Sequence, residues 1–244
     1  GMDILSNLSL FSGAGGLDLA FKWAGGFRTV AYVENDPYAQ GVLMSRIRDG
    51  GLDDAPIWDD VTTFDGKPWR GLVDVVSGGF PCQPHSQIGR RTGEKDKRNL
   101  WPQMLRVIKE VAPRYVLAEN VSGIFDSGYA AEVLASFEEA GYGATPCSIC
   151  ACAIGAPHSR ERVFFVADSD LHGWSTWRGH DGSLGSEGRT LDRVRTWEAA
   201  EPKMERVADG VAFRVDRSRC IGNGVVPQQA LPAIQRIKEL AGIG

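Results

Sequence analysis

The chain has 244 residues, a formal net charge of −4, 43% hydrophobic residues and 24% charged residues. This length suits one α/β domain with a small appendage, and the composition is ordinary for a globular protein in water. No apolar run reaches the ~20 residues of a membrane span, and no signal-peptide pattern is present, so we expect a cytoplasmic protein without membrane contact. The five cysteines, odd in number and unevenly spaced, then predict reduced thiols.

Short apolar runs alternate with helix-period segments as far as residue 167. We expect strands at 8–11, 29–33, 57–58, 73–77, 115–118, 148–154 and 163–167, and helices at 17–23, 37–47, 101–111 and 130–140. Asp36 before Pro37 is a typical helix start, and Gly141 is a typical residue after a helix end. The alternation predicts an α/β fold with a doubly wound, mostly parallel sheet.

The alternation stops at residue 168. Residues 169–219 combine three tryptophans with Gly, Ser, Asp and many arginines and show no sustained period, which predicts a small loop-rich lobe. An amphipathic helix is expected from Pro227 to the end of the chain. We therefore divide the chain into a main domain, 2–168 plus 220–244, and a small lobe, 169–219.

The first expected strand leads into a glycine turn, Phe11 to Gly16, and then into a helix. Glycines there allow a ligand to approach the backbone and the helix N–H groups. The turn is neither a dinucleotide fingerprint, because its sixth position is Asp18, nor a P-loop. Glu34 ends the second expected strand, where an acidic side chain can bind the ribose hydroxyls of a nucleoside. Asp60 follows the short strand at 57–58, where it can accept from an adenine amino group. Together these residues predict a nucleoside site, although each acid alone is also typical of a helix cap or a surface charge.

Two further strands end in reactive side chains. Cys82 follows an apolar run and the pair Gly78-Gly79, and Pro81 restricts the backbone beside it. Glu119 follows the strand expected at 115–118. Because open α/β sheets hold ligands at the carboxyl ends of their strands, we expect a nucleophilic thiol and a carboxyl group at one edge.

Two other interpretations were weighed. Cys147, Cys150 and Cys152, with His158 nearby, invite a zinc site, but the spacing lacks a second paired motif, so we expect no metal. A nicotinamide-dependent oxidoreductase conflicts with Asp18 in the glycine turn and leaves the cysteine without a role.

The matching pieces of a larger pattern run along nearly the whole chain: FSGAGG (11–16), Glu34, Asp60, GGFPCQPHS (78–86), ENV (119–121), APHSRERVFFVA (156–167) and GNGVVP (222–227). In this order they resemble the DNA (cytosine-5) methyltransferase family, of prokaryotic or phage type with a short recognition region. The resemblance implies a Rossmann-like methyltransferase fold and S-adenosyl-L-methionine as cofactor. It implies the following cofactor contacts: Phe11, Gly13, Gly15, Glu34, Asp60, Leu100, Asn223 and Val225.

The resemblance also implies a reaction. Cys82 would add to C6 of a flipped cytosine in duplex DNA, Glu119 would bind the base, and Arg160 and Arg162 would line its pocket, so that C5 receives a methyl group. The terminal helix would pack beside the glycine turn. A cognate restriction endonuclease is a further expected partner. The same chemistry on tRNA and a catalytically silent DNA-binding homologue are the alternatives.

The chain departs from the family pattern at several positions, Ser9, His85, His158 and Gly224, and in length. Ser9 stands where an acidic residue usually begins the first motif, and the lobe at 169–219 is shorter than the recognition region of most members. The short lobe bears on sequence specificity, because base-edge contacts are what distinguish one site from another.

Overall fold

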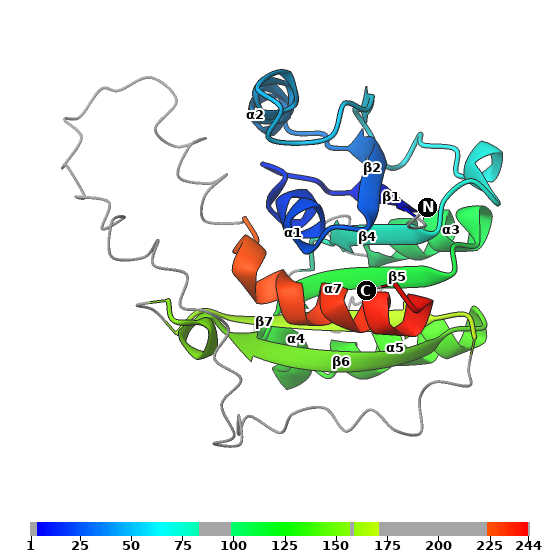
Figure 1. Cartoon of the computed structure of the whole chain (residues 1–244). Coiled ribbons are helices and arrows are strands. Elements are labelled where there is room, and N and C mark those ends of the chain that lie inside the picture. Colours follow the sequence, from blue (N-terminus) through cyan, green and yellow to red (C-terminus); the bar gives the residue numbers. More distant parts are fainter. Residues whose placement is uncertain (1–3, 83–98, 157–158, 171–223, 244) are drawn as a thin grey trace.

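The structure is a computed structural model that describes residues 4–82, 99–156, 159–170 and 224–243. Its centre is a seven-stranded sheet in the order β3-β2-β1-β4-β5-β7-β6 (Figure 1). The strands are β1 Leu5–Leu10, β2 Phe27–Val33, β3 Ile57–Trp58, β4 Val75–Gly79, β5 Tyr115–Val121, β6 Gly143–Cys150 and β7 Glu161–Asp168. The helices are α1 Gly16–Ala24, α2 Pro37–Arg48, α3 Trp101–Val111, α4 Gly123–Asp126, α5 Tyr129–Glu139 and α7 Pro227–Ala241, with short 3₁₀ helices at Lys67–Trp69 and Ala151–Ile154.

The strand order reverses between β1 and β4. β1 pairs in parallel with both β2 and β4, and β4 pairs in parallel with β5. Only β7 runs against its neighbours, β5 and β6. Ligands of open α/β sheets bind at such a reversal, beyond the carboxyl ends of the strands. The segments that follow β1, β2, β4 and β5 therefore meet at one edge.

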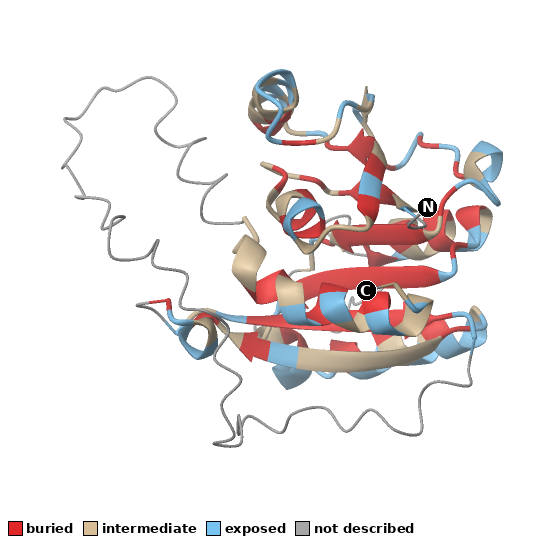
Figure 2. Ribbon diagram, in the orientation of Figure 1, coloured by how far each residue is buried: buried red, intermediate tan, exposed pale blue. Residues whose placement is uncertain are grey.

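Helices cover both faces of the sheet, and successive strand residues face opposite sides (Figures 1 and 2). On one face, Val76 and Val116 pack in a buried cluster with residues of α3 and α5. On the other face, Val75 and Leu117 pack with residues of α1 and α7. The terminal helix thus lies beside α1, and Nζ of Lys238 donates to the carbonyl oxygen of Ala24 over 2.9 Å.

The expected fold class is confirmed: the sheet is doubly wound and mostly parallel. The expected helices are present, and the helix expected at 101–111 has the observed bounds. Asp36 caps α2 by accepting from the backbone N–H groups of Tyr38 and Ala39. Among the described residues, no helix is long and apolar enough to cross a membrane.

The prediction for residues 148–154 is wrong in part. The strand there begins earlier, at Gly143, and ends at Cys150, where the chain turns into a 3₁₀ helix over Ala151–Ile154. This turn brings the Cα atoms of Cys150 and Cys152 to 5.2 Å, and a disulfide joins the two residues. The expectation of reduced thiols therefore fails for this pair, whereas Cys82 and Cys147 are free.

The division into a main domain and a small lobe stays a prediction, because nearly all of 169–219 lies outside the described residues.

Gly16 offers a test of how α1 packs. A Cβ atom added there would lie 2.5 Å from the carbonyl oxygen of Val225, so either the helix or the 225 segment must move. Overpacking of this kind costs about 1–3 kcal/mol, and we expect Gly16→Ala to lower the free energy of unfolding by that amount. Gly41 of α2 is a matched control, since a Cβ atom there would meet nothing within 4 Å. Gly41→Ala should stabilise the protein by about 0.5–1 kcal/mol. Urea denaturation measures the free energy of unfolding of both variants. Equal changes in the two variants would contradict the close packing of Gly16 against Val225.

Candidate active site

The glycine turn after β1 is held in an unusual backbone conformation. Phe11, Gly13 and Gly15 have φ angles of 53°, 54° and 76°, in the left-handed region that non-glycine residues such as Phe11 rarely adopt. The N–H of Ser12 donates to the carbonyl oxygen of Val33 over 3.1 Å, which ties the turn to the end of β2. Strained backbone that the surroundings enforce in this way is common at ligand sites.

Glu34 holds the same turn from the other side. Its Oε2 atom accepts from the N–H of Gly13 over 2.6 Å, and its Oε1 atom accepts from the N–H of Asp36 over 2.8 Å. The side chain is largely buried. Each carboxylate oxygen has a second lone-pair site, so Glu34 retains acceptor capacity for a ligand hydroxyl.

The space around the turn suits a nucleoside ligand. A Cβ atom added at Gly13 would meet only the carbonyl oxygen of Phe11, at 4.0 Å, so the region above this residue is open. The segment that begins at Gly224 closes one side, because Val225 lies against Gly16. The residues present therefore fit the cofactor that the resemblance implies, although Asn223 lies outside the described residues.

Asp60 lies at the same edge but outside the sheet. The N–H of Glu34 donates to the carbonyl oxygen of Trp58 over 2.9 Å, which places the end of β3 beside Glu34. Asp60 itself is two residues further on, is half-buried, and accepts from the N–H of Thr62 over 2.8 Å. This hydrogen bond lowers the pKa of Asp60. The carboxylate is therefore charged at neutral pH and keeps acceptor capacity for a ligand.

Cys82 stands just beyond β4 on a braced segment. Nδ2 of Asn120 donates to the carbonyl oxygen of Phe80 over 3.0 Å, and the N–H of Leu100 donates to that of Pro81 over 3.1 Å. The thiol is half-buried, and this burial, with a smaller contribution from the Glu132 carboxylate, raises its pKa. The thiol is thus protonated at neutral pH in the free protein.

Glu119 forms a buried ion pair with Arg162. Its Oε1 atom lies 2.8 Å from Nε of Arg162, and the side chains are 9% and 10% exposed. The two groups are an ion pair without a well-formed hydrogen bond, since Nε has no hydrogen-bond partner among the described residues. Burial raises the pKa of Glu119 to about 7, while Arg162 and then Arg160 oppose this shift. The carboxyl group therefore exchanges a proton near neutral pH.

The backbone of β4 makes room for this carboxyl group. Gly79 pairs with Glu119 in the sheet, and a Cβ atom added at Gly79 would lie 2.6 Å from Oε2 of Glu119. Val121 pairs with Arg162 across β5 and β7, which explains how Arg162 reaches the carboxylate from the neighbouring strand. Burial lowers the pKa of Arg160, which donates to the carbonyl oxygen of Gly224 over 2.9 Å.

The structure therefore brings the predicted residues together in three groups along one edge. Phe11, Gly13, Gly15, Glu34 and Val225 surround the glycine turn; Leu100 braces Cys82; Glu119, Arg160 and Arg162 form the third group. Arg160 links the third group to the first through Gly224. Within the described residues, no hydrogen bond or ion pair joins the Cys82 thiol to Glu119.

Sequence reasoning missed two buried polar residues near these groups. Asp18 accepts from Oγ of Ser9 over 3.0 Å, so α1 supplies a carboxyl group beneath the strand position where the family pattern has one. Gln229 of α7 donates from Nε2 to the carbonyl oxygens of Ile149 and Arg160, over 2.9 and 2.8 Å. In the sequence, both residues could have been found as polar positions within the apolar faces of their helices, α1 for Asp18 and α7 for Gln229.

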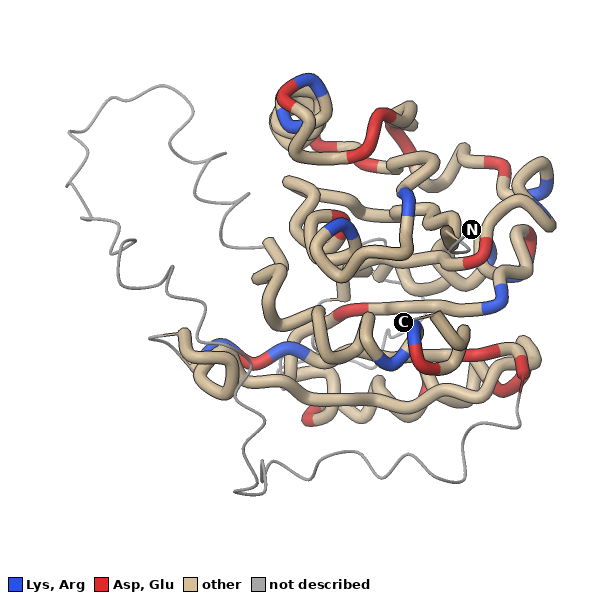
Figure 3. Tube along the Cα trace, in the orientation of Figure 1, with Lys and Arg blue, Asp and Glu red and all other residues tan. Residues whose placement is uncertain are grey.

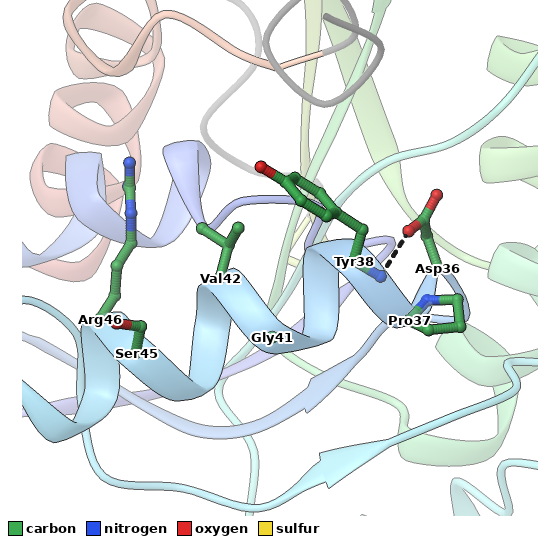
Figure 4. A pocket seen from close by; sticks show the side chains of 7 residues that line it. All are labelled: Asp36, Pro37, Tyr38, Gly41, Val42, Ser45 and Arg46. Carbon is green, nitrogen blue, oxygen red and sulfur yellow. Dashed lines mark hydrogen bonds between the residues drawn. The ribbon is translucent and has the colours of Figure 1, made fainter. Parts of the chain in front are cut away.

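A shallow pocket also runs along the outer side of α2 (Figure 4). Tyr38, Val42 and Arg46, spaced four residues apart, point to the same side of the helix. None of the predicted site residues lines it, although the N–H of Asp36, at one end of the pocket, donates to Oε1 of Glu34. Among the described residues, no group of three His, Cys, Asp or Glu side chains is placed to hold a metal ion.

A family model described as C-5 cytosine-specific DNA methylase matches residues 5–181. The chain belongs to this family. The chain is 34% identical over 165 residues to the type II methyltransferase M.NgoMIV of Neisseria gonorrhoeae, covering 66% of this chain and 51% of that protein. It is 41% identical over 123 residues to the type II methyltransferase M.PspPI of Psychrobacter, covering 50% of this chain and 28% of that protein. The chain thus spans about half or less of the length of these relatives.

Solved structures share the fold. A putative DNA modification methyltransferase from an Escherichia coli prophage matches with a TM-score of 0.54 at 30% identity, over 67% of this chain and 46% of that one. A DNMT2 variant from Spodoptera frugiperda matches with a TM-score of 0.59 at 23% identity, over 72% of this chain and 53% of that one. The second likeness concerns the fold alone.

The ion pair between Glu119 and Arg162 predicts how Glu119 titrates. Removing the positive charge with Arg162→Gln should raise the pKa of Glu119 above its value of about 7, because burial then acts with less opposition. Arg160→Gln is the matched control and should raise it less, since Arg160 is the weaker of the two opposing charges. Carbon-13 NMR of labelled glutamate, with Glu119→Gln to assign the signal, measures the titration. A pKa that stays in place in Arg162→Gln would refute the coupling.

Proposed function

We propose that this methylase transfers a methyl group from S-adenosyl-L-methionine to C5 of cytosine in duplex DNA. The observation that carries the proposal is the buried Glu119–Arg162 pair, in which a carboxyl group with a pKa of about 7 lies at the strand edge that also bears Cys82. Such a carboxyl group can donate a proton to a ring nitrogen at neutral pH. Membership of the family supports the same reaction.

The cofactor is expected at the glycine turn. Phe11, Gly13 and Gly15 offer backbone groups, Glu34 offers a carboxylate for the ribose hydroxyls, and Asp60 offers an acceptor for an adenine amino group. Leu100, Asn223 and Val225 are proposed to complete the site. When bound, S-adenosyl-L-methionine supplies an electrophilic methyl group and leaves as a thioether.

Covalent activation of the base is assigned to Cys82. Cytosine C5 is a poor nucleophile, so the thiolate first adds to C6, forming an S–C6 bond while the C5–C6 π electrons become available at C5. Because the pKa of the free thiol is raised, its proton passes to a solvent water molecule as the S–C6 bond forms. After methyl transfer, a base removes the proton from C5, the double bond re-forms, and the S–C6 bond breaks.

Glu119 and the two arginines manage the charge on the ring. Glu119 in its protonated form donates to N3 as C6 is attacked and takes the proton back at elimination; acid catalysis of this kind contributes about 10²–10⁴-fold. Arg162 and Arg160 are proposed to stabilise the developing charge at O2. Because protonated Glu119 declines above pH 7 and the thiolate increases with pH, the rate should pass through a maximum.

The DNA contacts are proposed to lie mainly outside the described residues. Basic and acidic positions are interspersed along the described trace, so it presents no uniformly basic side for a phosphate backbone (Figure 3). We assign recognition to the lobe at 169–219, whose arginines can bind phosphates or read guanine. The target cytosine must be flipped out of the duplex, because a stacked base cannot reach Cys82 and Glu119 together. A cognate restriction endonuclease stays a prediction.

Methyl transfer itself tests the proposal. Tritiated S-adenosyl-L-methionine is incubated with duplex DNA and, separately, with tRNA; label in DNA alone supports the proposed substrate. Label in tRNA alone would move the same chemistry to RNA, and label in neither would indicate a silent homologue. Bisulfite sequencing of DNA from cells that express the protein then identifies the target site.

Cys82→Ser should abolish methyl transfer, because a hydroxyl group is a far weaker nucleophile than a thiolate, while S-adenosyl-L-methionine still binds. A duplex with 5-fluorocytosine at the target should trap the wild-type protein, since fluorine at C5 cannot leave as a proton. Mass spectrometry identifies the modified peptide. Modification at Cys147 or Cys220 instead of Cys82 would overturn the assignment, and Cys147→Ser, which alters a free cysteine outside the three groups, is the control.

Glu34→Ala should weaken binding of S-adenosyl-L-methionine by about 5- to 150-fold, because loss of a buried polar partner costs roughly 1–3 kcal/mol. Asp60→Ala should weaken it less, since Asp60 is less buried than Glu34 and its ligand contact competes more with water. Calorimetry measures both affinities. Unchanged affinity in both variants would place the cofactor elsewhere.

A further inference from the structure

Asp18 is a buried carboxyl group that the proposed reaction does not use. It lies in the first turn of α1, immediately after the glycine turn, and is 2% exposed. Its Oδ2 atom accepts from Oγ of Ser9 over 3.0 Å, and its Oδ1 atom accepts from Oγ1 of Thr29 over 3.3 Å. All of its hydrogen bonds to other residues are therefore with neutral groups of β1 and β2.

The hydrogen bonds of Asp18 lead directly into the glycine turn. Oγ of Ser9 also lies 2.9 Å from Oγ of Ser12, which stands between Phe11 and Gly13. The carboxyl group is thus joined through two hydroxyl groups to the backbone that is proposed to contact the cofactor.

No cation in the described chain pairs with Asp18. The titratable groups around it are Tyr32 of β2, Asp53 of the segment after α2, and Lys22 of α1, which lies 3.9 Å from Asp53. Lys238 of α7 binds the opposite end of α1, at Ala24. Burial raises the pKa of Asp18 to about 6, and Asp53 adds to the shift. At neutral pH the group is therefore a buried negative charge without a partner.

Such a charge opposes the usual electrostatics of a glycine turn. The first turn of a helix carries a partial positive charge, which makes a glycine turn followed by a helix attractive to phosphate. A buried carboxylate in that first turn acts against this positive charge. A ligand with a positive charge is then favoured at the turn, and the sulfonium group of S-adenosyl-L-methionine is such a charge.

We propose that Asp18 is a specificity-determining residue that selects the positively charged sulfonium cofactor over uncharged or anionic nucleosides at the glycine turn. The inference rests on the proposed use of S-adenosyl-L-methionine. Asp18 acts through the field beneath the turn and through Ser9 and Ser12, without touching the ligand. At an effective dielectric constant of about 20, one unit charge at a distance on the order of 10 Å changes an affinity roughly tenfold.

The experiment compares two ligands that differ in this charge. Calorimetry gives the affinities for S-adenosyl-L-methionine and for S-adenosyl-L-homocysteine, which lacks the methyl group and the positive charge at sulfur. At pH 8, Asp18→Asn should weaken binding of the first about tenfold and of the second less than about threefold. Asp53→Asn removes a neighbouring carboxylate that is hydrogen-bonded to the N–H of Thr29 and makes no direct hydrogen bond to Ser9, Ser12 or the turn among the described residues. Because Asp18 is ionised at pH 8 with or without Asp53, this variant should leave the ratio of the two affinities within about twofold.

The wild-type protein provides a second measurement that needs no variant. Protonation removes the charge of Asp18, so the preference for the sulfonium ligand should fall as the pH drops through about 6, and it should be independent of pH in Asp18→Asn. Asp53→Asn should move this transition to lower pH, because Asp53 raises the pKa of Asp18. Other groups in this pH range that titrate equally with either ligand bound change the two affinities equally, so they leave the ratio of the affinities for the two ligands unchanged.

The outcomes separate the two proposals. If the wild-type protein binds neither ligand, the proposed cofactor is wrong. If it binds both and the ratio of affinities is unchanged by Asp18→Asn and by pH, the role of Asp18 is overturned while the proposed function stands.

Discussion

The close approach of β1 and β4 is the constraint on which the rest of the structure depends. Leu10 pairs with Gly78 where the two strands end, and a Cβ atom added at Gly78 would lie 2.5 Å from the carbonyl oxygen of Leu10. Because the strand order reverses between these strands, their loops separate beyond this contact and turn toward opposite faces. The glycine turn and the Cys82 segment begin on either side of that separation. Two further glycines, Gly16 and Gly79, then admit Val225 and Glu119 to the same edge.

Three buried carboxyl groups share this edge, and their surroundings give them different properties. Glu34 accepts from two backbone N–H groups, Glu119 faces two arginines, and Asp18 has only hydroxyl partners. Hydrogen bonds and nearby cations favour the charged form, whereas burial opposes it. The same side-chain chemistry can therefore serve as a fixed acceptor, as a proton donor near neutral pH, and as a source of negative potential.

Sequence patterns predicted the frame of the molecule well and its buried polar contacts poorly. The helix at 101–111 and the acids at Glu34 and Glu119 follow from periodicity and from strand ends, which are local properties. The start of β6 was missed because Gly143, Ala144 and Pro146 are atypical of a strand interior. β6 tolerates a proline because it is an edge strand. The role of Gln229 depends on carbonyl groups 69 and 80 residues away, which no local pattern encodes.

The protonation states of the free protein indicate what substrate binding must change. Cys82 holds its proton because it is half-buried near a carboxylate, while the proposed reaction needs the thiolate. Glu119 is close to half-protonated at pH 7, while the reaction needs its proton at N3. A flipped cytosine that enters beside Arg162 excludes water from Glu119 and favours the neutral acid, which raises its pKa further. The same event covers the thiol, so loss of the thiol proton must be driven by bond formation to C6 and not by the resting environment. In the proposed reaction, activation of the nucleophile is therefore coupled to occupancy of the base pocket, because the raised pKa of the thiol disfavours the thiolate in the free protein.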